Sequence, residues 1–140
     1  MIKLDCIFCK IISGELPSYK VFEDEFTFAF LDINPISKGH TLILPKRHAV
    51  KLTDLNAVKS EKLMRGLQKV LSGIEGALNP EGLNIFANQC EIAGQVVPHL
   101  HFHIVPRETG DGMEFITPKA TLSEDEFIEV SKKISKTIEV

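Results

Sequence analysis

The segment 99–105 reads His-Leu-His-Phe-His-Ile-Val and places three of the chain's five histidines at every second position. Side chains of a β-strand alternate between its faces, so this pattern predicts a strand with a row of imidazoles on one face. Leu100, Phe102 and Ile104 would then enter the core from the other face. Imidazoles pack no better than threonine or valine would, so we interpret the row as reactive groups. The chain must therefore build a sheet with one apolar face and one chemically active face.

Two chemistries fit such a row of imidazoles. In the first, the histidines bind a zinc ion whose hydroxide attacks a substrate, with a further ligand from elsewhere in the chain. In the second, one imidazole is itself the nucleophile and its neighbours assist it electrostatically. The middle residue, His101, would then be the nucleophile. A non-catalytic binding or scaffold protein is a third hypothesis, which predicts ligand binding without turnover.

The composition excludes several broad classes. The chain has 140 residues, of which 44% are hydrophobic and 25% charged, as in an ordinary globular domain. Its net charge of -3 provides no basic surplus for a phosphate backbone, so we expect no nucleic-acid partner. The apolar stretches fall far short of the roughly 20 residues that span a bilayer. The first residues include charges and no apolar core, so we expect no membrane partner, no signal peptide and a cytoplasmic location.

Periodicity predicts an α+β fold with helices packed on an antiparallel sheet. Because the predicted strands follow one another through short turns, antiparallel pairing is expected. Segments of period two predict strands at 19–23, 26–31, 41–44, 83–88 and 99–105.

Two helices are predicted from apolar residues at helical spacing. The first covers 53–78 with Thr53 as its N-cap. The second follows a loop at 107–121, and Ser123 with Glu126 forms a capping-box pattern at its start. We expect this terminal helix to pack on the body of the chain or to cover the site.

Cys6 and Cys9 form a Cys-x-x-Cys pair among three cysteines. An odd cysteine count without an export signal favours a metal or redox role over a disulfide framework. Thioredoxin-like redox pairs follow a strand and open a helix, but only five residues precede Cys6. Zinc would need two more ligands, which histidines could provide.

Four segments follow one another along the chain: CIFCKII at 6–12, AFLDINP at 29–35, GHTLILPKRH at 39–48, and Gly94-Gln95 followed by the triad. In this order they resemble the histidine-triad (HIT) superfamily of nucleotide hydrolases and transferases. The resemblance covers about residues 5–107 and is strongest to the small prokaryotic-type proteins of the nucleotide-binding (Hint) branch. It implies the HIT-like fold, a sheet of about five antiparallel strands with two main helices, in a single domain over 1–140 that ends in a loop and helix at 108–140.

The resemblance implies cleavage at the α-phosphorus of a nucleoside 5'-phosphoramidate or a related adenylyl compound. His101 matches the nucleophile, which forms a nucleotidyl-histidine that water then hydrolyses to the monophosphate. His103 matches the histidine that contacts the phosphate. His40 matches a histidine that lies behind the triad, and Gln95 matches a residue on the leaving-group side. Val96 stands where the Hint branch often has a serine that helps to protonate a leaving amine. A diadenosine polyphosphate hydrolase and a non-catalytic nucleotide-binding protein therefore stay as alternatives.

The same resemblance implies a site for a purine nucleotide of the AMP type. Asp32 matches the carboxylate that accepts hydrogen bonds from both ribose hydroxyls. Asn88 and the backbone of Gly94 match groups on the phosphate side. The apolar slot around the base is matched by Ile7, Phe8, Ile11, Phe30, Ile33 and Leu42.

The resemblance also implies one structural zinc ion per chain. The matching ligands are Cys6, Cys9, His48 and His99, a closed set that leaves no coordination position for water. The zinc would therefore stabilise the fold and take no part in the reaction. A homodimer is expected as well, with the helix at 53–78 between the subunits.

Overall fold

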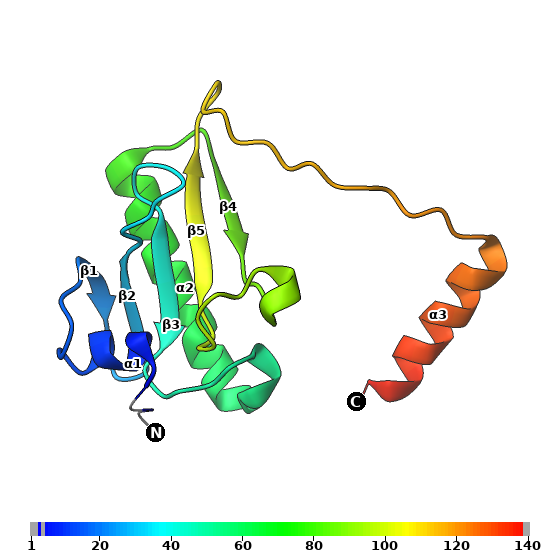
Figure 1. Cartoon of the computed structure of the whole chain (residues 1–140), viewed down its shortest axis with the longest axis horizontal. Helices are drawn as coiled ribbons and strands as arrows, with labels where there is room; N and C mark the ends of the chain where they lie inside the picture. The colour runs from blue at the N-terminus through cyan, green and yellow to red at the C-terminus, as the bar shows by residue number, and fades with distance from the viewer. Residues whose placement is uncertain (1–2, 4, 139–140) are drawn as a thin grey trace.

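A five-stranded antiparallel sheet in the order β1-β2-β3-β5-β4 is the centre of the computed structural model, which describes residues 3 and 5–138 (Figure 1). The predicted α+β class, with this sheet and two main helices, is confirmed. The elements are α1 (Ile7–Ile12), β1 (Lys20–Glu23), β2 (Thr27–Leu31), β3 (Thr41–Pro45), η1 (Leu52–Asp54), α2 (Ala57–Leu78), β4 (Gly82–Phe86), η2 (Glu91–Ala93), β5 (Phe102–Arg107) and α3 (Glu124–Thr137).

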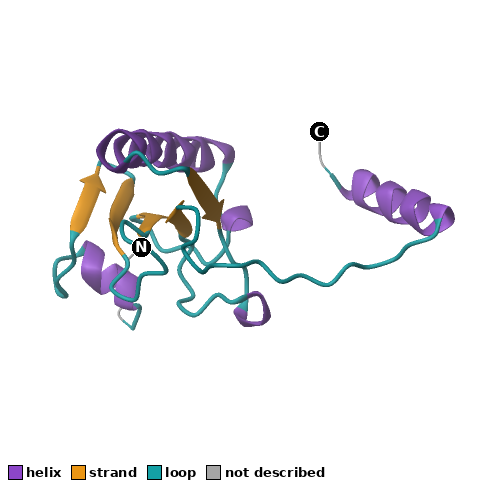
Figure 2. Cartoon of the chain, turned by 90° about the horizontal axis from the view of Figure 1, so that it is seen from above, coloured by secondary structure: helices purple, strands orange, loops and turns teal. Residues whose placement is uncertain are grey.

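The sheet separates two apolar cores, because α2 covers one face and α1 lies on the other (Figure 2). Strand β2 shows the alternation: Ala29 joins the core under α2, whereas Phe28 and Phe30 join the core under α1. On the α2 side the core also contains Ile43, Leu67, Val70, Ile74 and Ile104. The α1 side is only partly covered, which leaves room for a pocket there.

Helix α2 begins later than its sequence pattern predicts. Asn56 is its N-cap, and the Asn56 side chain accepts a hydrogen bond from the Lys59 N–H at 2.9 Å. Thr53 lies in the separate turn η1, so its prediction as the N-cap is wrong. The carboxylate of Asp54 holds that turn by accepting the N–H groups of Val50 and Lys51, both at 3.1 Å.

The histidine strand is shorter than its alternation predicts. Strand β5 begins after His101, because the Leu100 N–H donates to the Ala49 carbonyl at 2.6 Å, outside the β3–β5 ladder. The chain bends at His99, but its ring stays on the face that carries α1, because Phe8 of that helix lies 6.0 Å from the His99 ring and 5.0 Å from the His101 ring. His99 differs from the other two in its partners, since it faces the thiols of Cys6 and Cys9.

Helix α3 lies at the end of an extended arm that leaves the sheet after β5 (Figure 1). Its predicted capping box is present: the Ser123 hydroxyl accepts from the Glu126 N–H at 3.2 Å, and the Glu126 carboxylate accepts from the Ser123 N–H at 2.7 Å. Helix α3 contains no buried residue. The expectation that this helix packs on the body of its own chain is wrong, because its apolar residues have no partner within the described chain.

Within the described ranges, no helix combines the length and the apolar character that crossing a membrane requires.

The close packing of α2 against β2 predicts a stability effect at Gly66. A Cβ atom at Gly66 would lie 2.7 Å from Cγ2 and 2.8 Å from Oγ1 of the buried Thr27. We expect Gly66→Ala to lower the free energy of unfolding by about 1–3 kcal/mol, because the helix must move away from β2.

Gly73→Ala is the matched control in the same helix, since nothing lies within 4 Å of the added atom. It should stabilise by about 0.5–1 kcal/mol. Equal effects in urea denaturation would contradict this packing.

Candidate functional site

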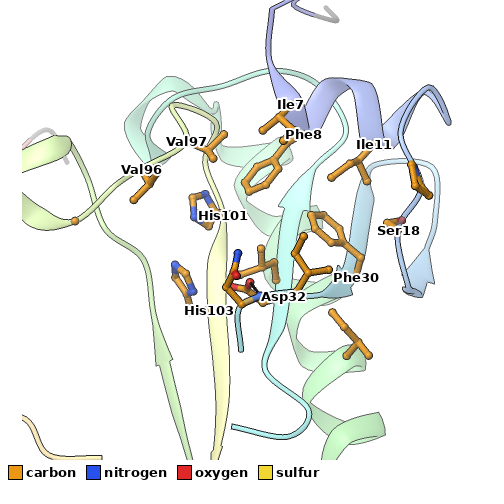
Figure 3. A pocket seen from close by; sticks show the side chains of 16 residues that line it. Ile7, Phe8, Ile11, Ser18, Phe30, Asp32, Val96, Val97, His101 and His103 are labelled. Atoms are coloured by element: carbon orange, nitrogen blue, oxygen red, sulfur yellow. Dashed lines mark hydrogen bonds between the residues drawn. The ribbon is translucent and has the colours of Figure 1, made fainter. Parts of the chain in front are cut away.

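A pocket of about 350 Å³ opens on the face of the sheet that carries α1 (Figure 3). Its wall is apolar and its polar end is formed by Asp32, His101 and His103. All six residues expected around a base lie in its lining: Ile7, Phe8, Ile11, Phe30, Ile33 and Leu42. The structure thus places an apolar slot directly beside two members of the histidine row.

The tautomer of His101 follows from its hydrogen bond. Its Nδ1 lies 2.6 Å from the carbonyl oxygen of His99. A carbonyl only accepts, so Nδ1 carries the proton and Nε2 keeps its lone pair. Burial lowers the pKa of His101 below the ordinary imidazole value. His101 is therefore a neutral imidazole with one free nitrogen at the pocket, the form in which an imidazole can act as a nucleophile.

The tautomer of His103 follows from a chain of hydrogen bonds that starts at the backbone N–H of Ile36. The Ile36 N–H donates to Nδ1 of His40 at 3.0 Å, so neutral His40 carries its proton on Nε2. That Nε2 lies 3.0 Å from Nδ1 of His103, which must accept. The remaining proton of His103 is thus on its Nε2. Burial, together with the nearby His101 and His40, lowers the pKa of His103 to about 4, so this donor is neutral near pH 7.

The two rings form an acceptor–donor pair. The His101 and His103 centroids are 4.9 Å apart, and Phe86 of β4 stacks on His103 at 4.7 Å with an interplanar angle of 13°. Phe86 was not among the predicted site residues. It lies opposite His103 in the β4–β5 register, so only the pairing of two strands distant in the sequence reveals it.

Asp32 lies directly after β2 and lines the pocket. One carboxylate oxygen accepts from the Asn34 N–H at 2.8 Å, and the other lies 3.6 Å from Nε2 of His40. The Asp32 charge opposes the effect of burial at His40, but burial is the larger influence and the pKa of His40 is lowered. Asp32 thus adds an anionic hydrogen-bond acceptor next to the histidine pair.

The structure separates the residues expected on the phosphate and leaving-group side. Gly94 lines the pocket, whereas Gln95 and Asn88 lie outside its lining. Gln95 is buried and both ends of its amide are used: Nε2 donates to the Val50 carbonyl at 2.8 Å, and Oε1 accepts from the Cys90 N–H at 2.9 Å. Asn88 donates weakly to the Gly94 carbonyl at 3.4 Å. Both amides support the loop that carries Gly94.

A second cluster joins Cys6, Cys9, His48 and His99, whose donor atoms all lie within 4.8 Å of one another. The distances between sulfur and Nδ1 are 3.4 Å for Cys6–His99, 3.5 Å for Cys9–His48 and 3.7 Å for Cys9–His99. Two ligands at about 2.3 Å (sulfur) and about 2.1 Å (nitrogen) from a tetrahedral zinc ion are separated by about 3.6 Å. These three distances match that separation, so the donor set fits a zinc ion.

The surroundings of this cluster prepare His99 as a ligand. Nε2 of His99 lies 2.9 Å from the Pro45 carbonyl, so it carries the proton and leaves the Nδ1 lone pair facing the thiols. Burial lowers the pKa of His99 to about 4, which keeps the ring neutral. Nε2 of His48 is buried and has no hydrogen-bond partner among the described residues.

The positions of the three rings separate the two chemistries left open by the sequence. His99 faces the thiols, His103 bonds to His40, and Nδ1 of His101 is held by a carbonyl. Three imidazoles arranged this way do not converge on one ion. The donor atoms of Asp32, His40 and His103 also lie within 4.8 Å of one another, but there the two imidazoles are already bonded to each other. The arrangement favours a nucleophilic imidazole over a zinc hydroxide held by the triad.

Comparisons with known proteins agree with this geometry. A model of the HIT domain matches residues 13–110. A Schizosaccharomyces pombe protein named adenosine 5'-monophosphoramidase is 38% identical over 136 residues, which cover 96% of this chain and 99% of that one. A crystal structure of a HIT-family member from Bacillus subtilis has a TM-score of 0.91 and 37% identity, covering 97% of this chain and 99% of that one. A zinc-bound histidine-triad protein from Mycobacterium smegmatis has a TM-score of 0.73 and 33% identity, with 95% of each chain covered. This chain belongs to the HIT family.

Proposed function

We propose that this protein hydrolyses a nucleoside 5'-phosphoramidate or a related adenylyl compound through a covalent nucleotidyl-His101 intermediate. One observation carries the proposal: at the polar end of an apolar slot, the ring of His101, whose Nε2 is free, lies 4.9 Å (centroid to centroid) from the ring of His103, whose Nε2 carries the proton. The name of the fungal relative supports the substrate class, since it is an adenosine 5'-monophosphoramidase.

Different residues act on the base, the ribose and the phosphate of the ligand. The base occupies the slot beside Phe8 and Phe30, and Asp32 accepts the ribose hydroxyls. Nε2 of His101 attacks the α-phosphorus, forming an N–P bond while the P–N bond to the leaving amine breaks, and the amine takes up a proton from solvent. Water then displaces the imidazole and releases the monophosphate. The His103 N–H stabilises charge on the phosphoryl oxygens in both steps.

A diadenosine polyphosphate is the second candidate substrate, and Val96 is the observation that favours it. Val96 lines the pocket and is 90% exposed, at the position where a hydroxyl would protonate an amine. A polyphosphate leaves as an anion and needs less help from a proton donor. Tight binding of the monophosphate without any turnover would instead point to the non-catalytic role.

We further propose that the ion of the Cys6, Cys9, His48 and His99 cluster is a structural zinc. The four donors complete a tetrahedral set, so no position is left at which the ion could activate water. The thiols must be reduced to bind it, which agrees with the proposed cytoplasmic location.

We also propose that the protein is a homodimer with α2 between the subunits, and that the second copy covers α3 as well. A helix of 14 residues is marginal in water, and Phe127 and Ile134 on one side of it are 60% and 55% exposed. The start of the arm is fixed by Arg107, which donates to Asp111 at 2.6 Å and to Asn84 at 2.7 Å. The Bacillus structure matches 97% of the chain, so its likeness extends into the arm.

The covalent step predicts the effect of replacing the nucleophile. His101→Gln should lower kcat for AMP release from adenosine phosphoramidate by at least about 10³-fold, because glutamine offers no nucleophilic nitrogen. AMP should still bind, since the slot and Asp32 are unchanged. Val96→Ser is the informative companion and should raise the phosphoramidate rate relative to the diadenosine polyphosphate rate. Turnover retained in His101→Gln would reject the covalent mechanism.

The lowered pKa values predict the pH profile. The reactive forms of His101 and His103 are neutral, so protonation inactivates them and the rate falls as pH falls. Because the pKa of His103 is about 4, kcat/KM should stay level from pH 8 to about pH 6 and decline only below that. An inflection near 6.5, the value of an ordinary imidazole, would contradict the burial argument. Circular dichroism at each pH would show that the protein is still folded.

The uncovered helix predicts the oligomeric state. Light scattering at micromolar concentration should give the mass of two chains, and the double variant Phe127→Ser with Ile134→Ser should give one, because it removes apolar contacts with the second copy. Lys132→Ser with Lys136→Ser changes two polar residues of the same helix and should leave the dimer intact. A single-chain mass for the unaltered protein would reject the proposal.

A further inference from the structure

Helix α1 is shared by the two clusters of the site. It has only six residues, and Cys6 and Cys9 place their thiols against His48 and His99. Ile7, Phe8 and Ile11, on the same short helix, line the apolar slot. A helix of this length is not stable by itself in water, so its position depends on what holds it.

Among the described residues beyond Lys3, the polar attachments of α1 to the rest of the chain all pass through the four donors. Within the described residues, the backbone hydrogen bonds of the segment 5–16 remain inside it or run to Lys3. The side chains that reach beyond it by hydrogen bonds are Cys6 and Cys9, at 3.4–3.7 Å from His48 and His99. Apart from these contacts, the helix is held by apolar packing.

That apolar packing depends mainly on Phe8. Its ring meets Phe30 edge-on at 5.6 Å and His101 at 5.0 Å. Ile7, by contrast, is 48% exposed and lines two pockets, one at the slot and one beside His48. In the described part of the chain, α1 has no backbone hydrogen bond to the sheet and its Ile7 is half exposed, so this wall of the slot can move outward if the thiols lose their hold.

We propose that the metal ion bound by Cys6, Cys9, His48 and His99 sets the affinity for the nucleotide base by fixing α1 as the wall of the slot. This inference rests on the proposed function, since it assigns the slot to a base. Asp32, His101 and His103 stand on the sheet or directly beside it and are not part of α1. The metal therefore acts on the base and leaves the ribose and phosphate contacts in place.

Thermodynamic linkage makes the coupling reciprocal. If the bound ion tightens nucleotide binding by some factor, the nucleotide tightens binding of the ion by the same factor. The coupling can thus be read from metal affinity alone, without any turnover.

The first test compares two ligands on the full-length protein. The dissociation constants of AMP and of ribose 5-phosphate are measured by titration calorimetry or NMR, with the zinc-loaded protein and after removal of zinc by a chelator. We expect AMP to bind on the order of tenfold more weakly without zinc and ribose 5-phosphate to change by less than about threefold. Equal losses for both ligands would mean that the ion merely maintains the fold, and no loss for either would reject the coupling.

The second test measures zinc release to a chromogenic chelator with and without AMP. AMP should raise the apparent zinc affinity by the same factor, on the order of tenfold. Ile11→Ala, which trims the wall, should reduce this factor, whereas Cys90→Ser changes an exposed thiol outside the cluster and should leave it unchanged. A factor of one in the unaltered protein would overturn the inference.

The two tests also separate this inference from the proposed function. If zinc-loaded protein binds AMP and releases it from a phosphoramidate, yet shows no linkage, only the inference fails. If zinc-loaded protein binds no AMP, the assignment of the slot fails and the inference fails with it.

Discussion

The two clusters of this protein meet at one residue, His99. Its ring faces the thiols of Cys6 and Cys9, and its backbone carbonyl holds Nδ1 of His101 at 2.6 Å. That short bond determines which nitrogen of His101 is free, so the reactive lone pair depends on where the main chain of residue 99 lies. The Pro45 carbonyl fixes the other side of the His99 ring at 2.9 Å. The bond to His101 does not involve the nitrogen that faces the thiols, so the main chain of His99 can hold the proposed nucleophile in place whether or not an ion is bound.

The backbone determines which histidine of the pair His101 and His103 offers a lone pair and which offers an N–H. The Ile36 N–H fixes the proton of His40, and His40 in turn fixes that of His103. His40 is buried and His103 is half-buried, so water does not readily exchange the protons between the two rings. The sheet itself thus decides that one imidazole offers a lone pair and its neighbour offers an N–H. Two histidines of identical chemistry acquire opposite roles because their hydrogen-bond partners differ.

Much of this arrangement could be predicted from the sequence, because short-range patterns report local structure. The alternation around His103 and the capping box at Ser123 are local, and both correspond to elements of the structure. The stacking of Phe86 on His103 could not be predicted in this way, because it depends on the pairing of β4 with β5. The amide of Gln95 illustrates the same limit: only the fold shows that both its ends support a loop.

Burial of the histidines has a consequence for the proposed reaction. Charged imidazoles would attract a phosphate strongly before any bond forms, and such binding gives no advantage to the transition state. Neutral rings do not bind the phosphate so strongly before the reaction. The pKa of His103, about 4, shows how strongly the site favours the neutral form. Positive charge then develops on His101 only as the N–P bond forms, close to the carboxylate of Asp32, which also lines the pocket. Burial therefore keeps the proposed nucleophile unprotonated before the reaction. The electrostatic attraction between His101 and Asp32 is then gained only as the N–P bond forms, where it lowers the barrier.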